Sequence, residues 1–112
     1  MPEEKENIQF ELTNELIEQV EQLIETKNDK QLRLLLDDFH YADIAEILDE
    51  LDLDDCIYII KLLDSETTSE ILMELDEDTR EKILKNLSAK EIAEEIEELD
   101  TDDAADIIAE LP

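Results

Sequence analysis

The stretches HYADIAEILDEL (residues 40–51) and DTDDAADIIAEL (residues 100–111) decide the fold, because each is one unit of a twelve-residue repeat. Seven consecutive units run from residue 28 to residue 111. Their closing residues are Phe39, Leu51, Leu63, Leu75, Leu87, Leu99 and Leu111. A regular period of this kind indicates a repeat architecture, in which each unit is stabilised by stacking on its neighbours.

Each unit has the pattern of a short amphipathic helix. Positions eight, nine and twelve are apolar, and this i, i+1, i+4 spacing places them on one helical face. One unit breaks the rule, since Glu95 occupies position eight. Glu91 follows Ser88 at the spacing of a capping box. All but one of the first positions are residue types that cap helix N-termini: Asn28, His40, Asp52, Asp64, Asp76, Ser88 and Asp100.

One continuous helix does not fit this pattern. Twelve helical residues advance the apolar face by about 120° beyond whole turns, so the stripe would spiral around the helix. The recurring caps instead indicate helices of roughly eight or nine residues, joined by turns of about two to four residues, which must stack to be stable. The predicted fold is all-α, a right-handed superhelix (a small α-solenoid) of short antiparallel helices. Residues 11–26 are predicted to form a longer first helix, and residues 1–10 are predicted to be disordered.

Composition limits the classes of partner. The 112 residues form one domain with 36 acids, nine Lys and Arg residues, and a net charge of −27. Nucleic acids and anionic membranes are disfavoured, because both are bound through basic side chains. Cations and basic protein surfaces are favoured. The chain has no Gly, so a turn that needs positive φ has no low-cost residue. No apolar run is long enough to span a membrane, and no signal peptide is present, so we expect a soluble, cytosolic fragment.

Catalytic chemistry has little support in this sequence, and we expect no enzyme. His40 is the only histidine and Cys56 the only cysteine, so neither a triad nor a zinc site can be built. We predict that His40 caps a helix or is satisfied between helices, and that Cys56 is a buried packing thiol. The loops that begin at Asp52 and Asp100 lack the Gly and Glu that an EF-hand requires at positions six and twelve.

The acidic end of the chain suggests a weak site for a hard cation. Residues 91–112 contain ten acids and no base. Asp102 and Asp106 are four residues apart on one predicted helix, so their carboxylates could share a hydrated Mg²⁺. Composition alone favours the simpler reading, in which most of these acids form a solvated face.

The segments HYADIAEILDEL and DTDDAADIIAELP resemble the cytosolic N-terminal domain of MgtE-type magnesium transporters. That family has openings of the type His-Pro-Ala-Asp-Ile-Ala-Glu and closing segments close to Asp-Pro-Asp-Asp-Ala-Ala-Asp. Tyr41 and Thr101 stand where the family often has Pro, and both changes leave the helix caps intact. The resemblance covers residues 12–112.

This resemblance implies a Mg²⁺-sensing regulatory domain on the cytoplasmic side of the cell membrane, in a longer chain with CBS and transmembrane domains. Its implied partners are magnesium ions and the CBS domains of the same chain, within a homodimeric transporter, with no insertion of this domain into the membrane. Ions between the two sets of carboxylates would favour the closed pore. Matching the family's ion-contacting positions selects Asp102 and Asp106, and then Glu70. The isolated domain should bind Mg²⁺ weakly, because half of each site lies elsewhere.

A different class of function remains open at this point. Similar superhelices of short helices occur in the flagellar motor switch protein FliG, where they bind other proteins. A protein-interaction module without ion sensing is therefore the alternative prediction.

Overall fold

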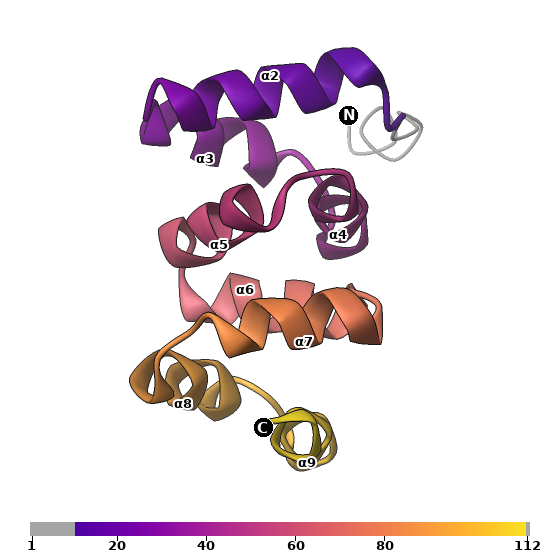
Figure 1. Cartoon of the computed structure of the whole chain (residues 1–112), viewed down its shortest axis with the longest axis vertical. Coiled ribbons are helices and arrows are strands. Elements are labelled where there is room, and N and C mark those ends of the chain that lie inside the picture. Colours follow the sequence, from indigo (N-terminus) through magenta and orange to yellow (C-terminus); the bar gives the residue numbers. More distant parts are fainter. Residues whose placement is uncertain (1–10, 112) are drawn as a thin grey trace, which may run out of the picture.

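The computed structural model describes residues 11–111, and this part of the chain contains eight helices and no strand (Figure 1). The predicted disordered segment 1–10 lies outside the described residues. The helices stack along the long axis of a body measuring 38 × 33 × 23 Å. They are α2 (Asn14–Glu25), α3 (Asp29–Asp37), α4 (Tyr41–Asp49), α5 (Leu53–Leu62), α6 (Ser65–Glu74), α7 (Glu77–Lys85), α8 (Ala89–Glu97) and α9 (Thr101–Glu110).

The twelve-residue repeat sets where the helices begin. The N-caps of α3 to α9 are the seven residues at the first repeat position, which confirms the predicted restart of the helix in every unit. Asp76 accepts a hydrogen bond from the Thr79 N–H at 2.7 Å, for example. The predicted capping box is also present, since the Ser88 N–H donates to Glu91 at 2.8 Å and the Glu91 N–H donates to Ser88 at 3.1 Å. Asp52 is an exception and makes no side-chain cap.

The first described helix differs from its predicted bounds. α2 begins three residues later than expected, because the Thr13 hydroxyl caps it by accepting from the Leu16 N–H at 3.1 Å. It ends in a left-handed turn at Lys27, whose φ is 56°. There the Asn28 N–H donates to the Leu23 carbonyl at 2.9 Å, which is the Schellman arrangement usually built on Gly. The chain adopts this turn without glycine.

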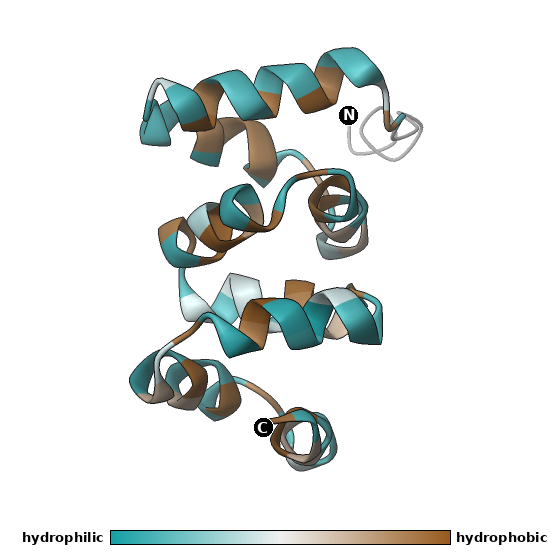
Figure 2. Cartoon of the chain, viewed as in Figure 1, coloured by the Kyte–Doolittle hydropathy of each residue, from teal (hydrophilic) through white to brown (hydrophobic). Residues whose placement is uncertain are grey.

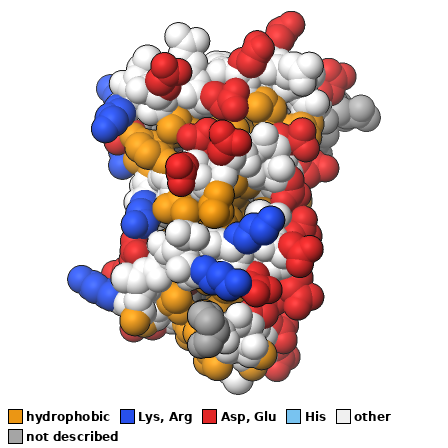
Figure 3. Space-filling view, viewed as in Figure 1, with side chains coloured by type: hydrophobic (Ala, Val, Ile, Leu, Met, Phe, Trp, Pro, Cys, Tyr) orange, Lys and Arg blue, Asp and Glu red, His pale blue; other side chains and the backbone are white. Residues whose placement is uncertain are grey.

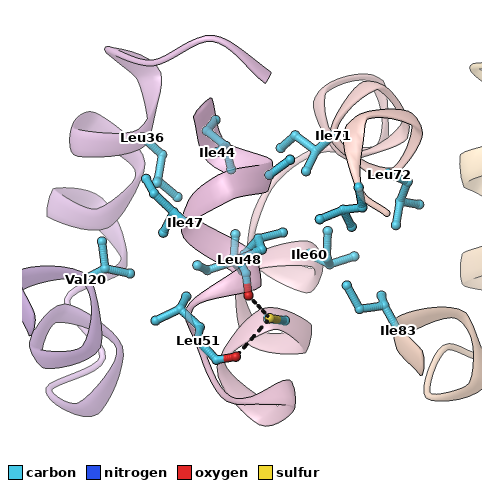
Figure 4. Close-up of a cluster of buried hydrophobic side chains, with 14 of the residues drawn as sticks. Val20, Leu36, Ile44, Ile47, Leu48, Leu51, Ile60, Ile71, Leu72 and Ile83 are labelled. Carbon is cyan, nitrogen blue, oxygen red and sulfur yellow. Dashed lines mark hydrogen bonds between the residues drawn. The ribbon is translucent and has the colours of Figure 1, made fainter. Parts of the chain in front are cut away.

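The apolar stripes of the repeat form one continuous core (Figures 2 and 4). Most residues at positions eight, nine and twelve of the repeat are buried. They are Leu36, Ile47, Leu48, Leu51, Ile59, Ile60, Ile71, Leu72, Leu75, Ile83, Leu84, Leu87 and Ile107. Leu35, Phe39, Leu63 and Leu111 pack on this core while partly exposed. Ile108, at position nine of the last unit, is instead 55% exposed. α9 is the last described helix, and no later described element covers that side of it.

The most extensive contact joins two alternate helices, α4 and α6, and the consecutive helices α2 and α3 also pack together. α6 packs against both α4 and α8, and α5 packs against α7. Two polar contacts also join alternate helices, since Tyr58 on α5 donates to Asp29 on α3, and Thr68 on α6 donates to Glu95 on α8. The all-α class is therefore confirmed, and the stack is compatible with a superhelix. The right-handed sense and the antiparallel pairing stay predictions.

Cys56 is a packing thiol, as predicted. It is buried among the apolar side chains of the core, and its Sγ donates to the Leu48 carbonyl at 3.0 Å (Figure 4). Burial raises the pKa of the thiol to about 12, so the reactive thiolate is disfavoured. In the described part of the chain, no helix is both long and apolar enough to cross a membrane.

Candidate functional site

The three predicted ion ligands are all exposed side chains on helices. Asp102 and Asp106 lie on α9, and Glu70 lies on α6. Among residues 11–111, none of the three forms an ion pair with a Lys or Arg side chain. Their carboxylates therefore remain available to a cation from solvent.

α9 is positioned by a cap, a buried residue and an ion pair. Asp100 caps its N-terminus by accepting from the Asp103 N–H at 2.9 Å. Ile107 is fully buried, so the opposite face of the helix, which bears Asp102 and Asp106, is turned to solvent. The α9 helix also packs against α8. The two aspartates are thus held one turn apart on a helix whose inner face is fixed.

Arg80 fastens α9 to the preceding helices. Its guanidinium donates to both carboxylate oxygens of Glu110, at 2.7 and 2.6 Å. The same group also donates to the Leu72 and Leu75 carbonyls at the end of α6, at 3.2 and 3.1 Å. One side chain on α7 therefore joins α6 to α9. A bidentate arginine–carboxylate pair fixes orientation as well as distance.

The charges around this tie affect one another. The hydrogen bonds from Arg80 lower the pKa of Glu110, and the hydrogen bond to Glu110 is the main cause of the raised pKa of Arg80. Asp106 adds to that rise through its charge. Partial desolvation, followed by repulsion from Asp100, Asp106 and Asp102, raises the pKa of Asp103. The carboxylates at the start of α9 therefore repel one another, and a bound cation would reduce this repulsion.

The structure does not gather the predicted ligands into one complete metal site. In residues 11–111, no group of three or more His, Cys, Asp and Glu residues could hold a metal ion. Acidic side chains instead form a band along the edge of the molecule where α4 and α9 lie, while basic side chains lie nearer the middle and the opposite edge (Figure 3). The prediction concerned half-sites completed by another domain, so Asp102, Asp106 and Glu70 stay predictions.

Sequence reasoning missed one pair of acids that share a partner. The Thr79 hydroxyl donates to Asp49 at 3.2 Å, while the Thr79 N–H donates to Asp76 at 2.7 Å. Burial and the charge of Asp76 raise the pKa of Asp49. Asp49 and Thr79 are 30 residues apart, so no local pattern could have predicted this contact.

Sequence reasoning also left Glu95 without a role. This carboxyl is 5% exposed and accepts a hydrogen bond from Thr68. The signal was present in the repeat, because Glu95 occupies a position that is otherwise apolar. What the sequence could not supply was the partner, which lies 27 residues away.

Comparison with known proteins identifies the family. The family model for the MgtE intracellular N domain matches residues 39–112, which is well over half of the chain. The chain belongs to the MgtE intracellular N domain family. No curated protein and no solved structure matches the chain. The matched region begins at the end of the first repeat unit and includes α4 to α9, with Arg80, Glu95, Asp102 and Asp106.

Membership of the MgtE N-domain family supports a transporter domain among the classes of function considered above. The family consists of transporter domains and is not a family of enzymes. Its description as intracellular agrees with the predicted cytoplasmic placement and connects the chain with magnesium transport. The flagellar interaction module receives no support from the family match.

Proposed function

We propose that this MgtE N domain is the magnesium-responsive regulatory domain of a magnesium transporter. Mg²⁺ binds between its acidic face and CBS domains of the same chain, and this bridging favours the closed pore. When Mg²⁺ is scarce, repulsion between the two acidic surfaces separates them. The ion is then the ligand that biases a two-state arrangement.

The observation that carries this proposal is the arrangement of α9. Asp102 and Asp106 lie one turn apart, exposed and without an ion pair to any described residue, on a helix held by the Arg80–Glu110 pair. Mg²⁺ keeps several waters and is commonly bound through one or two carboxylates. A fixed pair of carboxylates on an outer helix is suited to half of such a site. Glu70, exposed on α6, is proposed as a further ligand.

A magnesium titration followed by amide NMR tests the site. We expect saturable shifts that cluster around Asp102 and Asp106, at weak affinity because only two carboxylates hold the ion. The variant Asp102→Asn/Asp106→Asn should lose these shifts. A matched control is Glu21→Gln/Glu25→Gln on α2, which removes two exposed acids at the same spacing, far from α9.

The control separates a site from general screening. If the control variant loses as much response as the α9 variant, or if shifts are spread evenly over all acids, the proposed site is wrong. In the full-length transporter, Asp102→Asn/Asp106→Asn should keep the pore open at Mg²⁺ concentrations that close the parent. An unchanged Mg²⁺ dependence of the pore would contradict the regulatory role of these two residues.

A further inference from the structure

Glu95 is an acid at a position where the repeat requires an apolar residue. The equivalent position eight holds Leu35, Ile47, Ile59, Ile71, Ile83 and Ile107 in the other units. Glu95 is nevertheless buried, at 5% exposure, as the five isoleucines of this set are. Burying a carboxylate is far more costly than burying a neutral acid, because the charge loses its hydration. The site therefore favours the protonated form of Glu95.

The hydrogen bonds of Glu95 leave half of its carboxyl group unsatisfied. One oxygen accepts from the hydroxyl of Thr68, which is itself fully buried on α6. The other oxygen, Oε2, is buried and has no partner among the described residues. Thr68, Ser69 and Glu95 are the buried polar side chains of the described chain, and all three lie on α6 or α8. The α6–α8 contact is thus the polar part of an otherwise apolar core.

The charges that face Glu95 oppose its ionisation. Glu94 and Glu98 on its own helix and Asp64 at the start of α6 raise its pKa. On α5, Lys61 is the one basic residue lining the adjacent pocket, and it lies 3.8 Å from Glu91, a further acid of α8. Burial is the largest cause of the raised pKa of Glu95, and the Thr68 hydrogen bond lowers this pKa. The net effect of all causes raises the pKa of Glu95 to about 7.

A pocket beside Glu95 gives water and protons a route to it. It has a volume of about 170 Å³, and its lining includes Lys61, Ser65, Glu91, Glu94 and Glu95. This volume is several times the share of liquid volume that a water molecule occupies, about 30 Å³. An ionised Glu95 could therefore be solvated by water that enters the α6–α8 contact from this pocket.

We propose that Glu95 is a proton-binding group that makes the α6–α8 contact sensitive to pH. The protonated carboxyl stays in the contact, donating or accepting with Thr68. When it releases its proton to water, the carboxylate takes up water from the pocket and α8 loosens from α6. Because α9 packs against α8, the same step changes how firmly the helix of Asp102 and Asp106 is held. The pH response of Glu95 does not require that Asp102 and Asp106 bind Mg²⁺, so the two proposals can be tested separately.

The direct test is an NMR titration of the glutamate side-chain carboxyls in the intact 112-residue chain. Glu95 should titrate near pH 7, well above the ordinary value of 4.5. Thr68→Val should move this titration further upward, because the lost hydrogen bond favours the ionised form. A Glu95 carboxyl that titrates at its ordinary value, or a Thr68→Val change in the opposite direction, would overturn the proposal.

Unfolding measurements give the second test. Between pH 4.5 and pH 7 the folded chain holds the Glu95 proton and the unfolded chain does not, so unfolding releases one proton and stability falls as pH rises. Glu95→Gln should remove this part of the pH dependence. Glu94→Gln neutralises an exposed neighbour whose charge is a smaller cause than burial of the raised pKa of Glu95, so it should retain most of this pH dependence. Equal pH profiles for wild type and Glu95→Gln would refute the proposal, and the wild-type titration decides the matter if Glu95→Gln does not fold.

Discussion

Arg80 should be the most sensitive charged residue of this MgtE N domain. Its side chain is 11% exposed and that of Glu110 is 13% exposed, so the pair is largely shielded from water. Arg80→Met keeps the aliphatic stem but removes both hydrogen bonds to Glu110 and both bonds to the α6 carbonyls. The variant leaves a mostly buried carboxylate without a partner.

The expected cost follows from this geometry. Removing one partner of a fully buried ion pair costs about 3–5 kcal/mol. Both side chains here keep some contact with solvent, which weakens the interaction, so we expect a loss of about 2–3 kcal/mol in the free energy of unfolding. Arg80→Lys should lose about half as much, because an ammonium keeps the charge without the planar two-point contact.

Urea unfolding followed by circular dichroism measures these losses. A double-mutant cycle with Glu110→Gln isolates the coupling between the two side chains. Amide hydrogen exchange should show that α9 loses more protection than α2 in Arg80→Met. The reasoning is refuted if Arg80→Met lies within about 0.5 kcal/mol of wild type, the range of ordinary surface substitutions, or if the cycle gives no coupling.

Two further predictions concern the core and the net charge. Leu72→Ala, at a fully buried position, should cost about 3 kcal/mol in unfolding free energy. Ile108→Ala is its control and should stay within about 0.5 kcal/mol of wild type, because Ile108 is 55% exposed. Equal losses would show that α9 is covered in solution. Mg²⁺ should raise the melting temperature more than Na⁺ at equal ionic strength, and calorimetry checks this. Equal shifts from both salts would argue against specific magnesium sites.

The helix starts could be predicted because capping is local. An N-cap and the N–H that it binds are three residues apart, so a repeat of Asp, Asn or Ser in the sequence is enough to locate them. The core stripe is local for the same reason, since positions eight, nine and twelve of one unit share a face. This is why the restart of the helix in every unit was confirmed, and why most predicted core residues are buried.

The candidate site was harder to predict because its ties cross between helices. Arg80 and Glu110 are 30 residues apart, and Thr68 and Glu95 are 27 residues apart. These separations follow from alternate helices packing together, which a twelve-residue pattern does not specify. The exposure of Ile108 has a related cause. Position nine of a unit is buried only where another helix covers it, and the pattern within the unit is the same in either case.

The net charge of −27 makes the distinction between screening and binding central to this domain. Thirty-six acids cannot be balanced by nine bases, so any added salt should favour the compact state by weakening repulsion. At about 0.15 M salt, charges separated by more than about 8 Å are largely screened from one another. Carboxylates one helical turn apart lie within that distance, so their repulsion survives in physiological salt. A divalent ion bound between Asp102 and Asp106 would therefore remove a repulsion that monovalent salt does not screen. A comparison of Mg²⁺ with Na⁺ in the α9 variant and in the α2 control thus tests the site itself rather than the charge of the whole chain.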